Sequence, residues 1–202
     1  MLTLRPAGTD RSTVEELLWP DLTRQRASAN LRSVIWRIRR AGMPDVLESS
    51  RTRVRLHGSV VSDVGEQTLR VHALLADEGA APEVVPRVDR LALDLLPGWC
   101  DDWLVLSREQ WDQTRLHGLE SLARWHRGRR DYLAALDAAI YAVDLEPYRE
   151  SAQRVLIEIH IAEGNFAAAI RQYQRFRGTV QRELGVSPTP QLTRLVHPVT
   201  HA

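Results

Sequence analysis

The sequence predicts a mainly α-helical protein with two parts: a small basic part that carries one β-hairpin, and a larger part built only from helices. Three observations predict this fold class. Residues 24–40 carry six arginines and no acid in a helix-like pattern, two short alternating stretches follow at 45–49 and 53–57, and residues from 66 onward give only helical signals. The hydrophobic fraction of 44% and the charged fraction of 26% are typical of a folded globular protein.

The basic part opens with two predicted helices. Ser12 and Glu15 form a capping-box pattern, in which each side chain satisfies a free backbone N–H at the start of a helix. The second helix is expected from about Ser28, or a few residues earlier, to Ala41, with Gly42 as its C-terminal stop.

A β-hairpin is expected after these helices, because residues 45–49 and 53–57 alternate around a polar turn. Residues 60–64 have the composition of a further short strand. The boundary between the two parts is therefore expected near 65, with domains at 1–65 and 66–196 and a tail at 197–202.

Glycine and proline residues divide the second part into helices. These helices are expected at 66–78, 83–95, 104–127, 131–145, 149–163, 166–184 and 189–196.

An internal repeat with a shift of 34 residues lies within the second part. The aligned pairs are Asp131/Asn165, Tyr132/Phe166, Ala134/Ala168, Ala135/Ala169, Leu136/Ile170, Leu122/Leu156 and His126/His160. A 34-residue period of paired helices is the signature of the tetratricopeptide repeat (TPR). Small residues at 135 and 169 allow two helices to approach closely. The two helices and the hairpin of the first part, taken together with this repeat in the second part, predict the fold. It is expected to be a winged helix-turn-helix with a small β-hairpin wing, followed by an all-helical TPR-like domain.

The helix over about 26–40 has two distinct faces on a wheel of about 100° per residue. Its buried stripe is expected to contain Ala27, Leu31, Ile35 and Ile38, with Val34 at the edge. The opposite stripe contains Arg26, Asn30, Ser33, Arg37 and Arg40, flanked by Arg24, Trp36 and Arg39. Guanidinium, amide and hydroxyl groups in one line are the groups that contact bases and phosphates in a DNA major groove.

The hairpin adds further basic side chains, Arg51 near its tip together with Arg53 and Arg55. Two helices followed by a basic hairpin is the order of a winged helix-turn-helix. A merely solvated arginine face is the alternative interpretation. The sequence between 22 and 44 argues against that alternative because it holds no acid, whereas soluble surfaces usually mix both signs.

These residues resemble a known family of proteins. The segment "VEELLWPD" followed by "ASANLRSVIWRIRRAG" resembles the winged helix of SARP-type regulators, which carry an OmpR-like DNA-binding domain. The segments at 95–123 and 146–192 resemble their TPR-like bacterial transcriptional activator domain. The resemblance implies a transcription factor that binds promoter repeats, with two protomers side by side on DNA, and that contacts RNA polymerase through residues 19–25.

The sequence departs from the family at its start, because Met1 falls where the first helix of an OmpR-like domain should end. The N-terminal sheet is therefore expected to be missing, which would expose Leu17, Leu18, Leu31 and Ile35. A second function remains open on this ground. In that reading the protein is a TPR-like interaction or regulatory module whose truncated winged helix no longer binds DNA.

Other function classes find little support in the sequence. It contains no phosphate-binding glycine loop, no zinc-protease motif and no nucleophile elbow, so neither an enzyme nor a cofactor is expected. The seven histidines and the single Cys100 lack metal-ligand spacing, so no metal site is expected. No apolar run is long enough to cross a membrane, and the start resembles no secretory signal, so a cytoplasmic location is expected.

Overall fold

The computed structural model describes residues 2–5, 7–42, 46–77 and 79–200. It divides the chain into two compact units, one of Met1–Glu66 with Trp99–Ser107, and one of Gln67–Gly98 with Arg108–Ala202. The predicted first hairpin residue at 45, the predicted helix end at 78 and the tail residues 201–202 lie outside the described residues.

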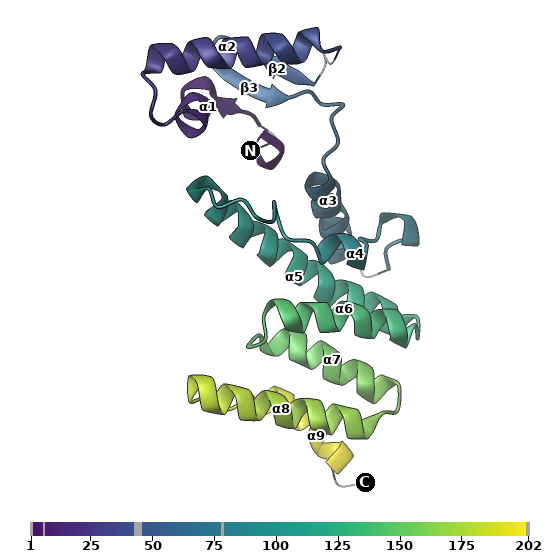
Figure 1. Ribbon diagram of the computed structural model, residues 1–202. Coiled ribbons are helices and arrows are strands. Elements are labelled where there is room, and N and C mark those ends of the chain that lie inside the picture. The colour runs from purple at the N-terminus through teal and green to yellow at the C-terminus, as the bar shows by residue number, and fades with distance from the viewer. Residues whose placement is uncertain (1, 6, 43–45, 78, 201–202) are drawn as a thin grey trace. The chain divides into compact units, whose positions relative to one another are not determined.

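The described residues of the first unit up to residue 62 form one 3-10 helix, two α-helices and a three-stranded antiparallel sheet with the strand order β1-β3-β2. Figure 1 shows helix α2 lying along one face of this sheet. The strand β1 was not predicted; it pairs with β3 so that Thr9 lies opposite Val54. The elements are the 3-10 helix η1 (Leu2–Leu4), β1 (Thr9–Asp10), α1 (Arg11–Leu18), α2 (Arg24–Arg40), β2 (Leu47–Ser49) and β3 (Arg53–Leu56).

A small apolar core holds this unit together. It consists of Val14 from α1, Leu31 and Ile35 from α2, and Val54 from β3. The helix pattern predicted Leu31 and Ile35 as buried, and they are only 3% and 6% exposed, so the expectation that a missing N-terminal sheet would expose them is wrong. The hairpin covers these side chains instead of the N-terminal sheet that was expected to be missing. Val54 of β3 lies in the core, and Leu47 of β2 packs against it. Leu18, by contrast, is 51% exposed, as expected.

The start of α1 differs from the predicted capping box. Asp10 is the N-cap residue, and no side chain caps the helix. The carboxylate of Asp10 instead lies 3.8 Å from Nε of Arg53, and the backbone N–H of Arg11 donates to the Thr52 carbonyl oxygen at 2.8 Å. The pairing of β1 with the hairpin therefore determines where α1 begins. Gly42 has a φ of +82°, which confirms it as the stop of α2.

Beyond residue 62 the described chain is helical or irregular. The elements are α3 (Asp63–Ala76), η2 (Pro82–Val84), α4 (Val88–Leu91), η3 (Asp102–Leu104), α5 (Val105–Gly128), α6 (Tyr132–Leu145), α7 (Glu150–Ala162), α8 (Phe166–Leu184) and α9 (Pro190–Thr200).

Two predicted elements in this region are wrong. The expected strand at 60–64 is absent from the described residues, because the Ser62 hydroxyl accepts from the Gly65 N–H at 3.1 Å and α3 already begins at Asp63. The single helix expected at 83–95 is replaced by the short helices η2 and α4. Pro86 separates these two helices, since proline has no N–H and disfavours a helical conformation at the preceding residue.

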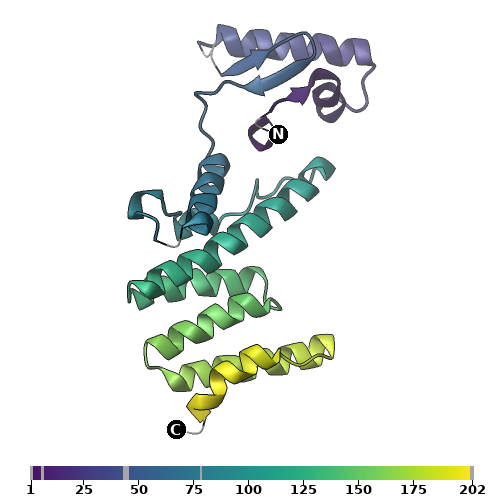
Figure 2. The same ribbon diagram turned by 180° about the vertical axis from the view of Figure 1, so that it is seen from behind.

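The 34-residue repeat is visible in the structure. Asp131 and Asn165 are the N-cap residues of α6 and α8, and their side chains accept from the backbone N–H three residues later at 3.3 and 3.2 Å. Ala135 and Ala169 are both fully buried. Figure 2 shows α6, α7 and α8 stacked in chain order, as in a TPR-like array.

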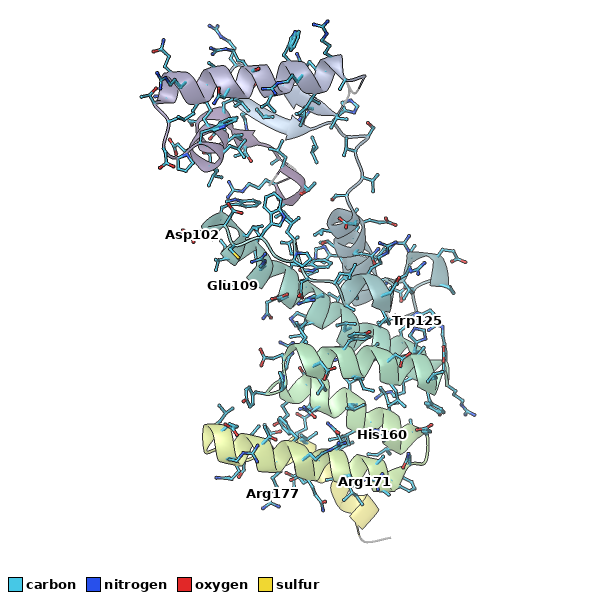
Figure 3. The ribbon with its side chains drawn as sticks, viewed as in Figure 1. Asp102, Glu109, Trp125, His160, Arg171 and Arg177 are labelled. Carbon is cyan, nitrogen blue, oxygen red and sulfur yellow. The ribbon has the colours of Figure 1, made fainter. Side chains whose placement is uncertain are left out.

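His126 and His160, which are paired in the repeat, lie in the last turns of α5 and α7, the first helix of each repeat. Nδ1 of His126 is 3.1 Å from the Asp131 carboxylate. His160 lies between α7 and α8 in Figure 3, and its pKa is lowered, mainly by burial and further by the charges of Arg171 and Arg175, although the charge of Glu163 acts in the opposite direction. The His160 imidazole is therefore expected to be neutral near pH 7 and to serve in packing.

Replacement of Gly118 by alanine is expected to destabilise the second unit. A Cβ at this position in α5 would lie 2.6 Å from Cγ2 of Val71 and 3.1 Å from Cδ1 of Leu91, and both of those side chains are fully buried. Overpacking of this kind lowers the free energy of unfolding by about 1–3 kcal/mol, measurable by urea denaturation. Gly178 is the matched control, because a Cβ there meets nothing within 4 Å. Gly178→Ala is expected to stabilise α8 by up to about 1 kcal/mol.

Candidate nucleic-acid interface

The packing of α2 determines which of its side chains reach solvent. Ala27, Leu31 and Ile35 are buried, as predicted, while Val34 and Ile38 are half-buried. Full burial of one leucine or isoleucine stabilises a fold by about 1.5–3 kcal/mol. The three buried side chains therefore fix the rotation of α2 about its own axis, and with it the identity of the exposed face.

The exposed face carries nearly all the side chains predicted for DNA contact. In Figures 1 and 2 no other element of the first unit covers the side of α2 that faces away from the sheet. Asn30 is half-buried, whereas the other predicted residues of α2 are exposed: Arg24, Arg26, Ser33, Trp36, Arg37, Arg39 and Arg40. Gln25, Ala29 and Arg32 share this exposure, although the sequence reasoning did not assign them to the site.

The arginines of α2 keep their charge uncompensated. Among the residues that the structure describes, no acid forms an ion pair with any of the six. The interactions present are local: Arg37 donates to the Ser33 hydroxyl at 3.4 Å, and the Arg40 guanidinium lies 5.0 Å from the centroid of the Trp36 ring. These guanidinium groups are available for an anionic ligand.

The hairpin exposes one arginine at its tip, whereas two others form hydrogen bonds within the first unit. The Ser50 hydroxyl accepts from the backbone N–H of Thr52 at 3.3 Å, which tightens the turn and leaves Arg51 exposed at its tip. Arg53 donates to the Gly8 carbonyl oxygen at 2.9 Å, and Nε of Arg55 donates to Glu48 at 2.8 Å. Arg53 and Arg55 therefore contribute to the fold as well as to the basic surface.

A cavity of about 640 Å³ lies between the end of α2 and the hairpin. Its lining includes Arg39, Ser49, Ser50, Arg53, Arg55 and His57, together with Ala7, Leu47 and the acidic Glu48. Arginine and serine side chains are suited to a phosphate group, whereas Glu48, which is paired with Arg55, reduces the positive charge of the cavity. Sequence reasoning did not assign Ser49, Ser50 or His57 to the site. The alternation of Arg53, Arg55 and His57 along β3 and its extension is the signal that could have found the histidine.

Within the described part of the chain, no group of three or more histidine, cysteine or acidic side chains is arranged to hold a metal ion. The helices of the described residues also include none with the length and apolarity needed to span a bilayer.

A family model and a solved structure are similar to this chain. The family model for the bacterial transcriptional activator domain matches residues 78–200, which is more than half of the chain. EmbR from Mycobacterium tuberculosis, solved in complex with a low-affinity phosphopeptide, resembles the whole chain with a TM-score of 0.61 at 18% sequence identity. The chain spans 59% of the length of that structure's chain. No curated protein matches the sequence.

The family match defines the class of the helical part, because residues 78–200 form a bacterial transcriptional activator domain, and the fold of the whole chain resembles that of EmbR. The chain belongs to the bacterial transcriptional activator domain family. The family resemblance found in the sequence is thereby confirmed.

Proposed function

We propose that the protein binds promoter DNA through α2 and the β2–β3 hairpin. In this proposal α2 enters the major groove and the hairpin lies over the adjacent minor groove. The observation that carries the proposal is the row of six exposed arginines on α2, which make no ion pair with any described residue. A winged helix uses its second helix in this way. The DNA-binding domain would comprise 1–65 and the helical activator domain 66–196.

The ten side chains proposed for DNA contact fall into two groups according to the part of the DNA that they would contact. Those that line the outer face of α2, Arg26, Asn30, Ser33, Arg37 and Arg40, would reach base edges, with Trp36 beside them. Arg24, Arg39, Arg51 and Arg53 would contact phosphates. The segment 19–25 between the two helices would face RNA polymerase, and two protomers would bind side by side on promoter repeats. Exposure of Leu22, at 38%, supports a protein contact there.

Binding is expected to weaken steeply as salt is raised. Four phosphate contacts release about four counterions, which gives a slope of about −3.5 in a plot of log affinity against log salt. Between 50 and 200 mM salt the affinity should therefore fall by about 100-fold. Fluorescence anisotropy with a labelled promoter duplex measures this slope. A slope near zero would contradict phosphate binding by these arginines.

A second function is favoured by a different observation. Helix α6 exposes Leu133, Ile140 and Tyr141, at 75%, 46% and 46%, on one face. Exposed apolar side chains on a helical repeat can bind a protein partner. In this alternative the protein is a TPR-like interaction module that does not bind DNA. It predicts co-purification with a protein partner and no sequence-selective DNA binding even at low salt.

A further inference from the structure

Trp36 is the largest apolar side chain on the exposed face of α2. It is 57% exposed, whereas Leu31 and Ile35 of the same helix are buried in the apolar core of the unit. It follows Ser33 by three residues and precedes Arg40 by four, so these three side chains lie along one line of the helix. A single exposed apolar residue is ordinary on a protein surface. A tryptophan in the middle of an arginine-rich face is not explained by solubility or by packing.

The ring of Trp36 is held in place by its neighbour. The Arg40 guanidinium lies 5.0 Å from the ring centroid, within the range of a cation–π contact. This contact restricts the rotation of the side chain. The remaining ring surface stays open to solvent, and it therefore presents a partly ordered apolar surface to whatever α2 meets.

In a major groove, one base carries an apolar group that this surface can contact. Thymine presents its C5-methyl group there, whereas the other base edges present hydrogen-bond donors and acceptors. The indole has one polar group, a donor N–H, so it cannot make the paired hydrogen bonds by which arginine or asparagine reads a base. We infer that Trp36 is a specificity-determining residue that contacts thymine methyl groups in the major groove.

This inference rests on the proposed DNA binding, and one experiment separates the two. The protein first selects its preferred sequence from a random duplex library. The selected duplex is then made with thymine or with uracil, which differ only by the C5-methyl group. We expect uracil to weaken binding by wild-type protein about fourfold for each methyl group contacted, the equivalent of one buried methylene.

Variants assign that difference to Trp36. Trp36→Ala should bind the thymine duplex more weakly than wild type, and its thymine-to-uracil affinity ratio should fall to about one. Trp36→Phe keeps an aromatic ring and should retain a ratio above one. Leu133→Ala is the control, because it removes an exposed apolar side chain from α6, outside the proposed DNA interface, and should keep the wild-type ratio.

Each outcome has a distinct meaning. Equal binding of the two duplexes by wild-type protein, or full thymine preference in Trp36→Ala, overturns the inference but leaves DNA binding standing. Failure of wild-type protein to select any sequence overturns both the proposed function and the inference. Circular dichroism of each variant confirms that the helical content is unchanged.

Discussion

Simultaneous replacement of Arg26 and Arg37 by alanine is expected to abolish sequence-selective DNA binding. Both side chains are exposed on the outer face of α2, and neither forms an ion pair with a described residue. Loss of a base-contacting arginine costs about 1–3 kcal/mol of binding free energy. Together the two substitutions should raise the Kd for the selected duplex by about 30-fold to about 20,000-fold. Anisotropy titration at fixed salt measures this change.

A matched control distinguishes the loss of these two arginines of α2 from a general loss of positive charge. Arg171 and Arg177 of α8 are also exposed arginines, and Figure 3 shows them on the side of α8 that faces away from α7. Arg171→Ala together with Arg177→Ala removes the same net charge from the helical domain. This variant should bind within about threefold of wild type, because α8 belongs to the other compact unit and is not part of the proposed DNA interface. Undiminished binding after loss of Arg26 and Arg37 would eliminate α2 as the recognition helix.

Replacement of Leu31 by alanine is expected to unfold much of the first unit. Leu31 is 3% exposed and packs with Val14, Ile35 and Val54. A buried leucine-to-alanine change lowers the free energy of unfolding by about 2–5 kcal/mol. A core this small gives the unit only a small free energy of unfolding, so a loss of this size is enough to unfold it. Hydrogen exchange should show lost amide protection in α1, α2 and the sheet, together with lost DNA binding, while α6, α7 and α8 remain protected.

The control for Leu31 is an exposed leucine. Leu69 on α3 is 72% exposed, so Leu69→Ala should change the free energy of unfolding by less than about 0.5 kcal/mol. If Leu31→Ala leaves amide protection in the first unit unchanged, the apolar cluster does not hold α2 in place. The account of how the sequence orients its basic face would then be wrong.

The regular parts of the fold could be predicted from the sequence because their signals are local. The spacing of Ala27, Leu31 and Ile35 predicted the buried side of α2, and Gly42 predicted its end. The strand β1 was missed because two residues carry no periodic pattern. It exists through pairing with β3, 43–45 residues further along the chain. That pairing also moved the helix cap from Ser12 to Asp10.

The candidate site was predictable to a similar degree. Exposure of the α2 arginines follows from helix periodicity, and the structure agrees for all of them. The bond from Arg53 to the Gly8 carbonyl oxygen could not be predicted, because it joins residues 45 positions apart. Likewise, the cavity beside Arg39 forms only when the hairpin folds back toward the end of α2.

The central claim is that α2 reads a DNA sequence, and the ratio of two dissociation constants tests it most directly. The purified 202-residue chain is titrated with its selected duplex and with a scrambled duplex of the same composition, both at about 0.15 M salt. The account predicts binding to the selected duplex at least about 1,000-fold tighter. Equal dissociation constants for the two duplexes would contradict it and would favour the protein-interaction module instead.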